Sequence, residues 1–114
     1  MYRYLNAPLL ISSTFPLTKP NQTTCEVTDL DSCIKICYKS YNKLVTYTAK
    51  KDSSNSGHYK FHCPDYPTEI STLHEFIVAS GNRVLEGSWR INDEEGFWKV
   101  ILYENTRISL DNND

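Results

Sequence analysis

The feature that most constrains the fold of this chain is a strict two-residue alternation near its C-terminal end. In the segment RVLEGSWRI (83–91), Leu85, Trp89 and Ile91 fall on one face, and polar side chains fall on the other. Successive side chains of a β-strand point to opposite faces of the sheet, so this period predicts a half-buried strand. We expect Leu85, Trp89 and Ile91 to face the core.

Similar segments fill the chain from residue 44 onward, and turn-forming Gly, Asn and Asp residues separate most of them. The strands predicted beside 83–91 are LVTYTA (44–49), HYKFHC (58–63), STLHEFIVA (71–79) and FWKVILY (97–103). Short connections force neighbouring strands to run antiparallel. The sequence therefore predicts an antiparallel meander of five to six strands, closed as a small barrel or sandwich around a core that includes Tyr59 and Phe61.

The segment TDLDSCIKICYKSY (28–41) fits two periods. As a helix it would begin at Thr28 with Asp31 in the third position, which approaches a capping box. As a strand it would alternate Ile34 and Ile36 with lysines. We favour one short N-terminal helix here, which makes the predicted fold class mainly β with α+β possible.

A chain of 114 residues corresponds to one domain. Pro8, Pro16 and Pro20 discourage a helix near the start, so we expect an extended N-terminal arm over 1–27, or an edge strand around Leu9–Ser12. The single β-rich domain would span 28–110, and 111–114 would be a polar tail. The first residues lack the pattern of a signal peptide, and the chain has no apolar run long enough for a membrane span.

Histidines and cysteines suggest a metal site, but their spacing argues against it. Cys33 and Cys37 are followed by His58 and His62, which superficially resembles a zinc-binding pattern. On a straight strand these histidines would lie about 13 Å apart, at roughly 3.3 Å per residue. Zinc needs ligand atoms about 2 Å away. We predict no metal and no cofactor, and keep an intracellular zinc-stabilised domain as an alternative.

The four cysteines are an even set, which suggests disulfides. We predict the pairs Cys37–Cys63 and Cys25–Cys33, with four reduced, buried cysteines as the alternative. Disulfides form in oxidising compartments, so this prediction implies an extracellular or secreted location.

Charge is divided unevenly along the chain. Residues 35–64 carry a net charge of +5, whereas residues 65–114 carry −6. The overall net charge of −2 argues against a dedicated nucleic-acid binder. Lysines interleaved with tyrosines suit a protein or polyanionic partner. We therefore predict a small, non-enzymatic binding module whose surface contains Lys35, Lys39, Lys43, Lys50, Lys51, Lys60, Tyr38, Tyr41 and Tyr47.

A different class of function is a β-barrel carrier of a small apolar ligand. Its cavity would be lined by Trp89, Trp98, Phe76 and Phe97. The sequence lacks a phosphate-binding loop, a nucleophile elbow and a metal-spaced set of carboxylates. It thus favours a non-enzymatic function, although a catalytic site assembled from distant residues would leave no linear motif.

Overall fold

The computed structural model of the protein describes residues 1–15, 17–51 and 58–110. Within these ranges the chain forms nine β-strands and one short 3₁₀ turn. The strands are β1 (Tyr2–Phe15), β2 (Asn21–Asp29), β3 (Cys33–Ser40), β4 (Lys43–Lys50), β5 (His58–His62), β6 (Ile70–Ile77), β7 (Arg83–Ile91), β8 (Glu94–Leu102) and β9 (Ile108–Ser109), and the turn is η1 (Glu104–Thr106).

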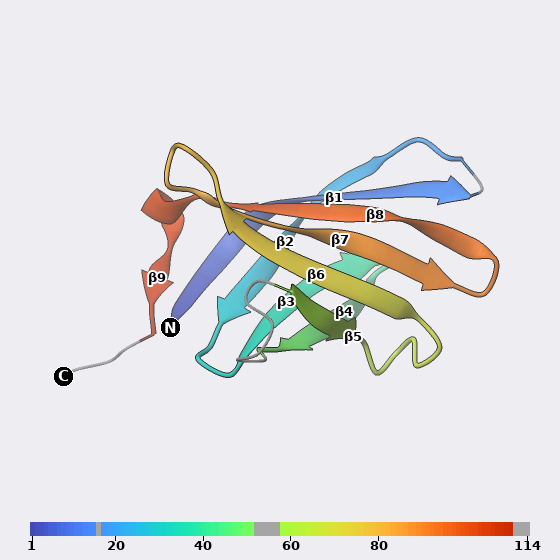
Figure 1. Ribbon diagram of the computed structural model, residues 1–114, viewed down its shortest axis with the longest axis horizontal. Coiled ribbons are helices and arrows are strands. Elements are labelled where there is room, and N and C mark those ends of the chain that lie inside the picture. The colour runs from blue at the N-terminus through green and yellow to red at the C-terminus, as the bar shows by residue number, and fades with distance from the viewer. Residues whose placement is uncertain (16, 52–57, 111–114) are drawn as a thin grey trace.

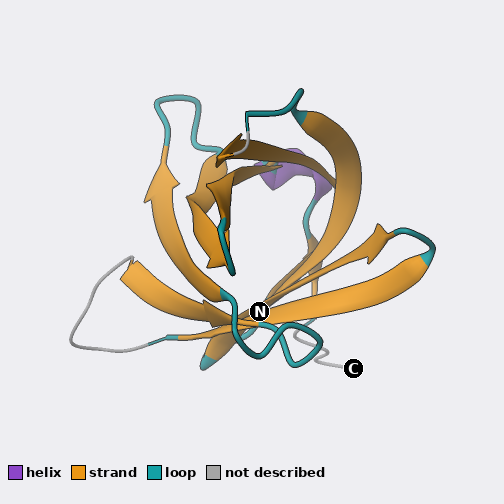
Figure 2. Ribbon diagram, turned by 90° about the vertical axis from the view of Figure 1, so that its right-hand side faces the viewer, coloured by secondary structure: helices purple, strands orange, loops and turns teal. Residues whose placement is uncertain are grey.

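The strands form a closed antiparallel barrel (Figure 1). From β2 to β8 each strand pairs with the next, and β1 then pairs with both β8 and β2 to complete a ring of eight strands. Figure 2 shows this ring viewed along the barrel axis. The short β9 pairs with the start of β1 outside the ring. The structure confirms a mainly β, antiparallel meander closed as a barrel, and the predicted count of five to six strands was too low.

The predicted N-terminal helix over 28–41 is wrong. Ile34 and Ile36 are buried in β3 while Lys35 between them is exposed, which is the period of a strand. A tight turn, in which the Leu30 amide donates to the Cys33 carbonyl, connects β2 to β3. The apparent capping box therefore lies at a hairpin. Among the described residues, η1 is the only helical element, and none of them forms a helix long and apolar enough to cross a membrane.

Residues 1–27, for which the sequence suggested an extended arm, hold β1 and most of β2. The pairing of β1 with β2 shifts between Tyr4 and Ala7, so this strand contains an irregularity of the β-bulge type. Tyr4, Ala7 and Leu9 are all buried, and the extra residue between the first two breaks the two-residue alternation. Pro16 and the predicted tail 111–114 lie outside the described residues.

The interior is packed unequally along the barrel axis. Towards the end where β7 begins and β8 finishes, the inward side chains are fully buried, among them Leu85, Val100 and Leu102. At the end where β7 finishes, Trp89 and Ile91 are only partly buried. We call the first the sealed end and the second the open end. The sealed end is dense core, and the open end contains a cavity.

Candidate ligand-binding cavity

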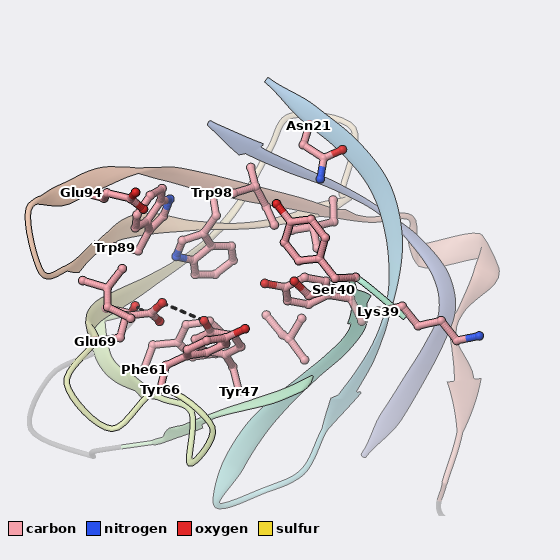
Figure 3. A pocket seen from close by; sticks show the side chains of 17 residues that line it. Asn21, Lys39, Ser40, Tyr47, Phe61, Tyr66, Glu69, Trp89, Glu94 and Trp98 are labelled. Carbon is pink, nitrogen blue, oxygen red and sulfur yellow. Dashed lines mark hydrogen bonds between the residues drawn. The ribbon is translucent and has the colours of Figure 1, made fainter. Parts of the chain in front are cut away.

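The cavity at the open end has a volume of about 500 Å³. Residues from all eight barrel strands and from the loop before β6 line it. Typical small-molecule sites occupy roughly 300–1,000 Å³ and combine apolar walls with a few converging polar groups. Figure 3 shows aromatic rings on several sides of this cavity, and Glu69 among them. Its size and lining fit a small organic molecule.

A continuous aromatic stack forms one wall of the cavity. The ring centroids of Tyr38 and Tyr47 lie 6.3 Å apart, those of Tyr47 and Phe61 4.7 Å, and those of Phe61 and Trp98 5.0 Å. The interplanar angles are 12°, 26° and 24°, so all three pairs are stacked. Because β5 and β8 are not neighbours in the sheet, the contact between Phe61 and Trp98 crosses the barrel interior. The stack therefore links strands that are not adjacent in the sheet.

Trp98 is held by a hydrogen bond to the backbone of β6. Its Nε1 donates to the main-chain carbonyl of Thr72 over 3.1 Å, and the Ser88 amide donates to the Thr72 hydroxyl over 3.1 Å. Gly87 makes this approach possible. A Cβ atom on Gly87 would lie 1.8 Å from the Thr72 carbonyl oxygen and 2.9 Å from Trp98 Nε1. The glycine is therefore needed to place the indole.

Glu69 is the charged group most firmly held in the cavity wall. The Tyr47 hydroxyl donates to its Oε1 over 2.9 Å, and the Ser71 hydroxyl donates to its Oε2 over 2.7 Å. Figure 3 shows the bond to Tyr47 as a dashed line. Burial, together with the neighbouring Glu69 carboxylate, raises the pKa of Tyr47, so the phenol stays protonated and remains a donor. Both partners of Glu69 are neutral hydroxyls.

The loop between β5 and β6 carries Glu69 to this place. The Tyr66 amide donates to the Cys63 carbonyl and the Glu69 amide to the Tyr66 carbonyl, each over 3.0 Å. Two successive turns therefore fold the loop back over the open end. Tyr66 and Glu69 both line the cavity as a result. No regular sequence period marks such a loop, and sequence analysis missed both residues.

Trp89 is the least well satisfied side chain of the lining. Its Nε1 atom is buried and has no hydrogen-bond partner in the part of the chain that the structure describes. The indole lies against Gly96, where a Cβ atom would come within 2.7 Å of Trp89 Cζ2. An unsatisfied buried donor costs about 1–3 kcal/mol. A ligand or a movement that brings an acceptor to Trp89 would recover part of this free energy.

The charged residues of the lining are mainly acidic. Glu69 and Glu94 both line the cavity, and Lys39 is the one basic residue among the described lining residues. Figure 3 shows the Lys39 side chain extending away from the cavity. The electrostatic environment inside therefore favours a positive group over a negative one.

The tyrosines predicted to form a binding surface separate into two environments. Tyr38 and Tyr47 point into the barrel and belong to the aromatic stack. Burial raises the pKa of Tyr38 to about 12. Tyr41 is fully exposed in the turn between β3 and β4, with the left-handed φ of 51° that a two-residue hairpin turn requires. All three tyrosines nevertheless border the same cavity.

The six predicted lysines also divide. Lys35, Lys39, Lys50 and Lys60 are exposed and alternate with inward residues, so they lie on the outer face of three neighbouring strands, β3 to β5. Lys43 Nζ pairs with Asp65 over 3.2 Å. Lys51 lies at the sealed end, where its Nζ contacts Asp29 over 2.6 Å. The structure thus brings four of the nine predicted residues together on the outer face and two, Tyr38 and Tyr47, inside the barrel.

The predicted disulfides are absent. All four cysteines are free thiols, and the two members of each predicted pair lie on opposite faces of the sheet. Cys25 and Cys63 are buried in the core, whereas Cys33 and Cys37 alternate with the buried Ile34 and Ile36 and are only partly buried. Burial raises the pKa of Cys25 to about 12 and also raises the pKa of Cys63. The described residues include no group of three or more His, Cys, Asp and Glu side chains that could hold a metal ion.

Two of the four residues predicted to line an apolar cavity do line it. Trp89 and Trp98 line it, but Phe76 and Phe97 are exposed on the outside of the barrel.

No known protein family, curated protein or solved structure matches this chain.

Proposed function

We propose that this protein is a small binding module that holds one small organic ligand in the open end of its barrel. The observation that carries the proposal is the cavity of about 500 Å³, with an aromatic stack on one side and an anchored polar group, Glu69, on another. A rigid apolar wall stabilises a ligand by removing its apolar surface from water, and a few fixed polar groups set its orientation. This arrangement supports the carrier function over a flat Lys/Tyr surface.

The proposal is tested with a neutral fluorescent probe, N-phenyl-1-naphthylamine, whose emission rises in apolar surroundings. We expect saturable binding with one site per chain. The cavity-filling variant Ile11→Trp should abolish it, because Ile11 lines the cavity. Leu44→Trp is the matched control, since Leu44 is exposed and absent from the lining. Unsaturable binding, or equal binding by both variants, would refute a site in the barrel.

A second candidate is recognition of a polyanion by the outer face of β3 to β5. The observation in its favour is the shared outward placement of Lys35, Lys39, Lys50 and Lys60. Binding of heparin, used as the probe, should weaken steeply with salt and fall in a Lys35→Glu/Lys60→Glu variant. Unchanged affinity in that variant would refute this candidate. The extracellular location stays a prediction, and the free thiols do not supply the disulfides on which it was based.

A further inference from the structure

We infer that the ligand of the barrel is an organic amine, bound with its protonated nitrogen at Glu69 and its apolar body against the aromatic stack. This inference rests on the proposed function, because it names the chemical class that the same cavity selects. Three independent features of the cavity support it: the sign of its charge, the geometry around Glu69, and the rings beside that carboxylate.

The sign of the charge disfavours an anionic lipid or fatty acid. The two carboxylates of the lining are Glu69 and Glu94, and Lys39 extends away from the interior. A carboxylate ligand in this space would lose its hydration and meet a like charge. A neutral ligand would leave the charge of Glu69 without an opposite charge. An ammonium group supplies one.

The hydrogen bonds of Glu69 leave it ready to accept more. Each of its oxygens accepts one described hydroxyl, Tyr47 at Oε1 and Ser71 at Oε2. A carboxylate has about four acceptor positions, so both oxygens retain capacity. The two hydroxyls also fix the orientation of the group before a ligand arrives. An ammonium offers three donors, and hydrogen bonds between charged partners are roughly twice as strong as neutral ones.

Aromatic rings surround the position that the ammonium would occupy. Figure 3 shows Tyr47, Phe61 and Tyr66 beside Glu69, with Trp89 and Trp98 on the adjoining wall. The faces of aromatic rings attract cations, and the attraction grows when water is excluded. The same rings provide apolar surface for the body of the ligand. A carboxylate within an aromatic enclosure is thus matched to a group that is cationic at one end and apolar at the other.

The test compares three probes of similar shape by isothermal titration calorimetry: 2-phenylethylamine, 2-phenylethanol and 3-phenylpropanoate. We expect the amine to bind at least about tenfold more tightly than the alcohol, and the carboxylate to bind most weakly. In Glu69→Gln the amine should lose about tenfold while the alcohol changes little, because the amide keeps the shape and loses the charge. Glu86→Gln, outside the lining of this cavity, should leave all three affinities unchanged.

The outcomes separate this inference from the proposed function. If the alcohol or the carboxylate binds the unmodified protein as tightly as the amine, the amine inference is overturned and the small-molecule site stands. It is also overturned if none of the three probes binds while N-phenyl-1-naphthylamine does. If no probe binds at all, the proposed function itself fails. The series on the unmodified protein decides the question even if Glu69→Gln does not fold.

Discussion

Asp29 at the sealed end and Glu69 at the open end of the barrel are both carboxylates, but their hydrogen-bond partners differ in charge. At the sealed end Asp29 accepts from Lys51 Nζ over 2.6 Å and from Arg83 Nη1 over 2.8 Å, and Arg83 also pairs with Glu75. At the open end Glu69 accepts only from the hydroxyls of Tyr47 and Ser71, as far as the described residues show. The sealed end balances its charge within the protein. The open end leaves a fixed negative charge for a ligand to balance.

Packing follows the same division. Leu85, Val100 and Leu102 are fully buried towards the sealed end. Inward residues of the same strands at the open end, such as Trp89 and Ile91, border the cavity. One sheet therefore encloses both a dense core, which stabilises the fold, and a cavity, which is separate from that core. Stability and binding should respond to different substitutions.

Removing the central cation of the sealed end should have the largest effect. The side chain of Arg83 is 15% exposed and that of Asp29 11%, so Arg83→Met leaves two carboxylates poorly compensated and nearly dry. Breaking a buried pair in this way costs about 3–5 kcal/mol. We expect a loss of that size in the free energy of unfolding, measured by urea denaturation. Arg3→Met is the control, because the pair of Arg3 with Glu26 is over 40% exposed and should contribute at most about 1 kcal/mol.

Arg83→Met should also change how the stability of the protein responds to acid. Burial alone would raise the pKa of Asp29, but hydrogen bonds from Lys51 and Arg83 hold it below its usual value. A depressed folded-state pKa gives stability that is present above the unfolded pKa, near 3.9, and is lost as the pH falls through the folded value. In Arg83→Met the folded pKa rises and this contribution shrinks. Acid unfolding should therefore begin at a higher pH than in the unmodified protein.

The next largest effects should come from truncating one apolar side chain at each end of the barrel, and the loss of stability should differ between the two ends. Leu85→Ala empties a fully packed position and should cost about 2–5 kcal/mol. Ile91→Ala removes a partly buried side chain that already borders a cavity, so it should cost clearly less. Urea denaturation of both variants measures the difference. Equal losses would mean that the open end is packed as tightly as the core, which would break the comparison.

Gly87 tests whether the open end depends on one backbone contact. Gly87→Ala would force a methyl group into the Thr72 carbonyl and the Trp98 indole, at a cost of about 1–3 kcal/mol. It should also shift tryptophan fluorescence, because Trp98 must move. Gly81→Ala is matched in chemistry: no atom lies within 4 Å of its Cβ position, but its φ is 89°. It should cost about 1–2 kcal/mol from backbone strain and leave the fluorescence unchanged. A silent spectrum for Gly87→Ala would contradict the proposed role of the glycine.

The sequence revealed those strands whose alternation is uninterrupted. Residues 83–91 are the clearest example, because an inward side chain recurs at every second position of β7. β1 was anticipated only as a possible short edge strand around Leu9–Ser12, because its irregularity between Tyr4 and Ala7 breaks that period. The segment containing β3 was misread because its residues fit the helical and the strand period equally well. Only pairing with β2 and β4 decides between them, and that pairing is a tertiary contact.

The candidate site was predictable in composition but not in arrangement. Trp89 and Trp98 were correctly predicted to line a cavity and Phe76 and Phe97 were not. Phe97 and Trp98 are adjacent on β8, so only one of them can face inward. The sequence does not show which. Glu69 gave no signal because a loop, folded back over the barrel, sets its position. The two-residue period of the sequence predicts strands, but it does not predict which loop residues, such as Glu69, border the cavity.

The smallest expected effects come from two phenols at opposite ends of the barrel. Tyr4 donates to Glu104 Oε1 over 3.1 Å near the sealed end, and Tyr47 donates to Glu69 Oε1 at the open end. Tyr4→Phe and Tyr47→Phe each remove one hydroxyl donor, which should cost about 0.5–1.5 kcal/mol in the free energy of unfolding. Only Tyr47→Phe should weaken binding of 2-phenylethylamine, because Tyr47 helps to orient Glu69 and Tyr4 does not contact it. Equal binding losses in both variants would contradict a binding role confined to the open end.

The pH dependence of the two variants checks the same assignment. Burial raises the pKa of Tyr4 to about 12, and burial with the Glu69 bond raises that of Tyr47. An unfolded tyrosine titrates near 10, so each folded phenol contributes stability that is complete below pH 10 and lost as the pH rises through the folded value. The unmodified protein should therefore lose stability above pH 10. Each Phe variant should lose less over that range, measured by urea denaturation at pH 9 to 11, since the group whose titration couples to unfolding is gone.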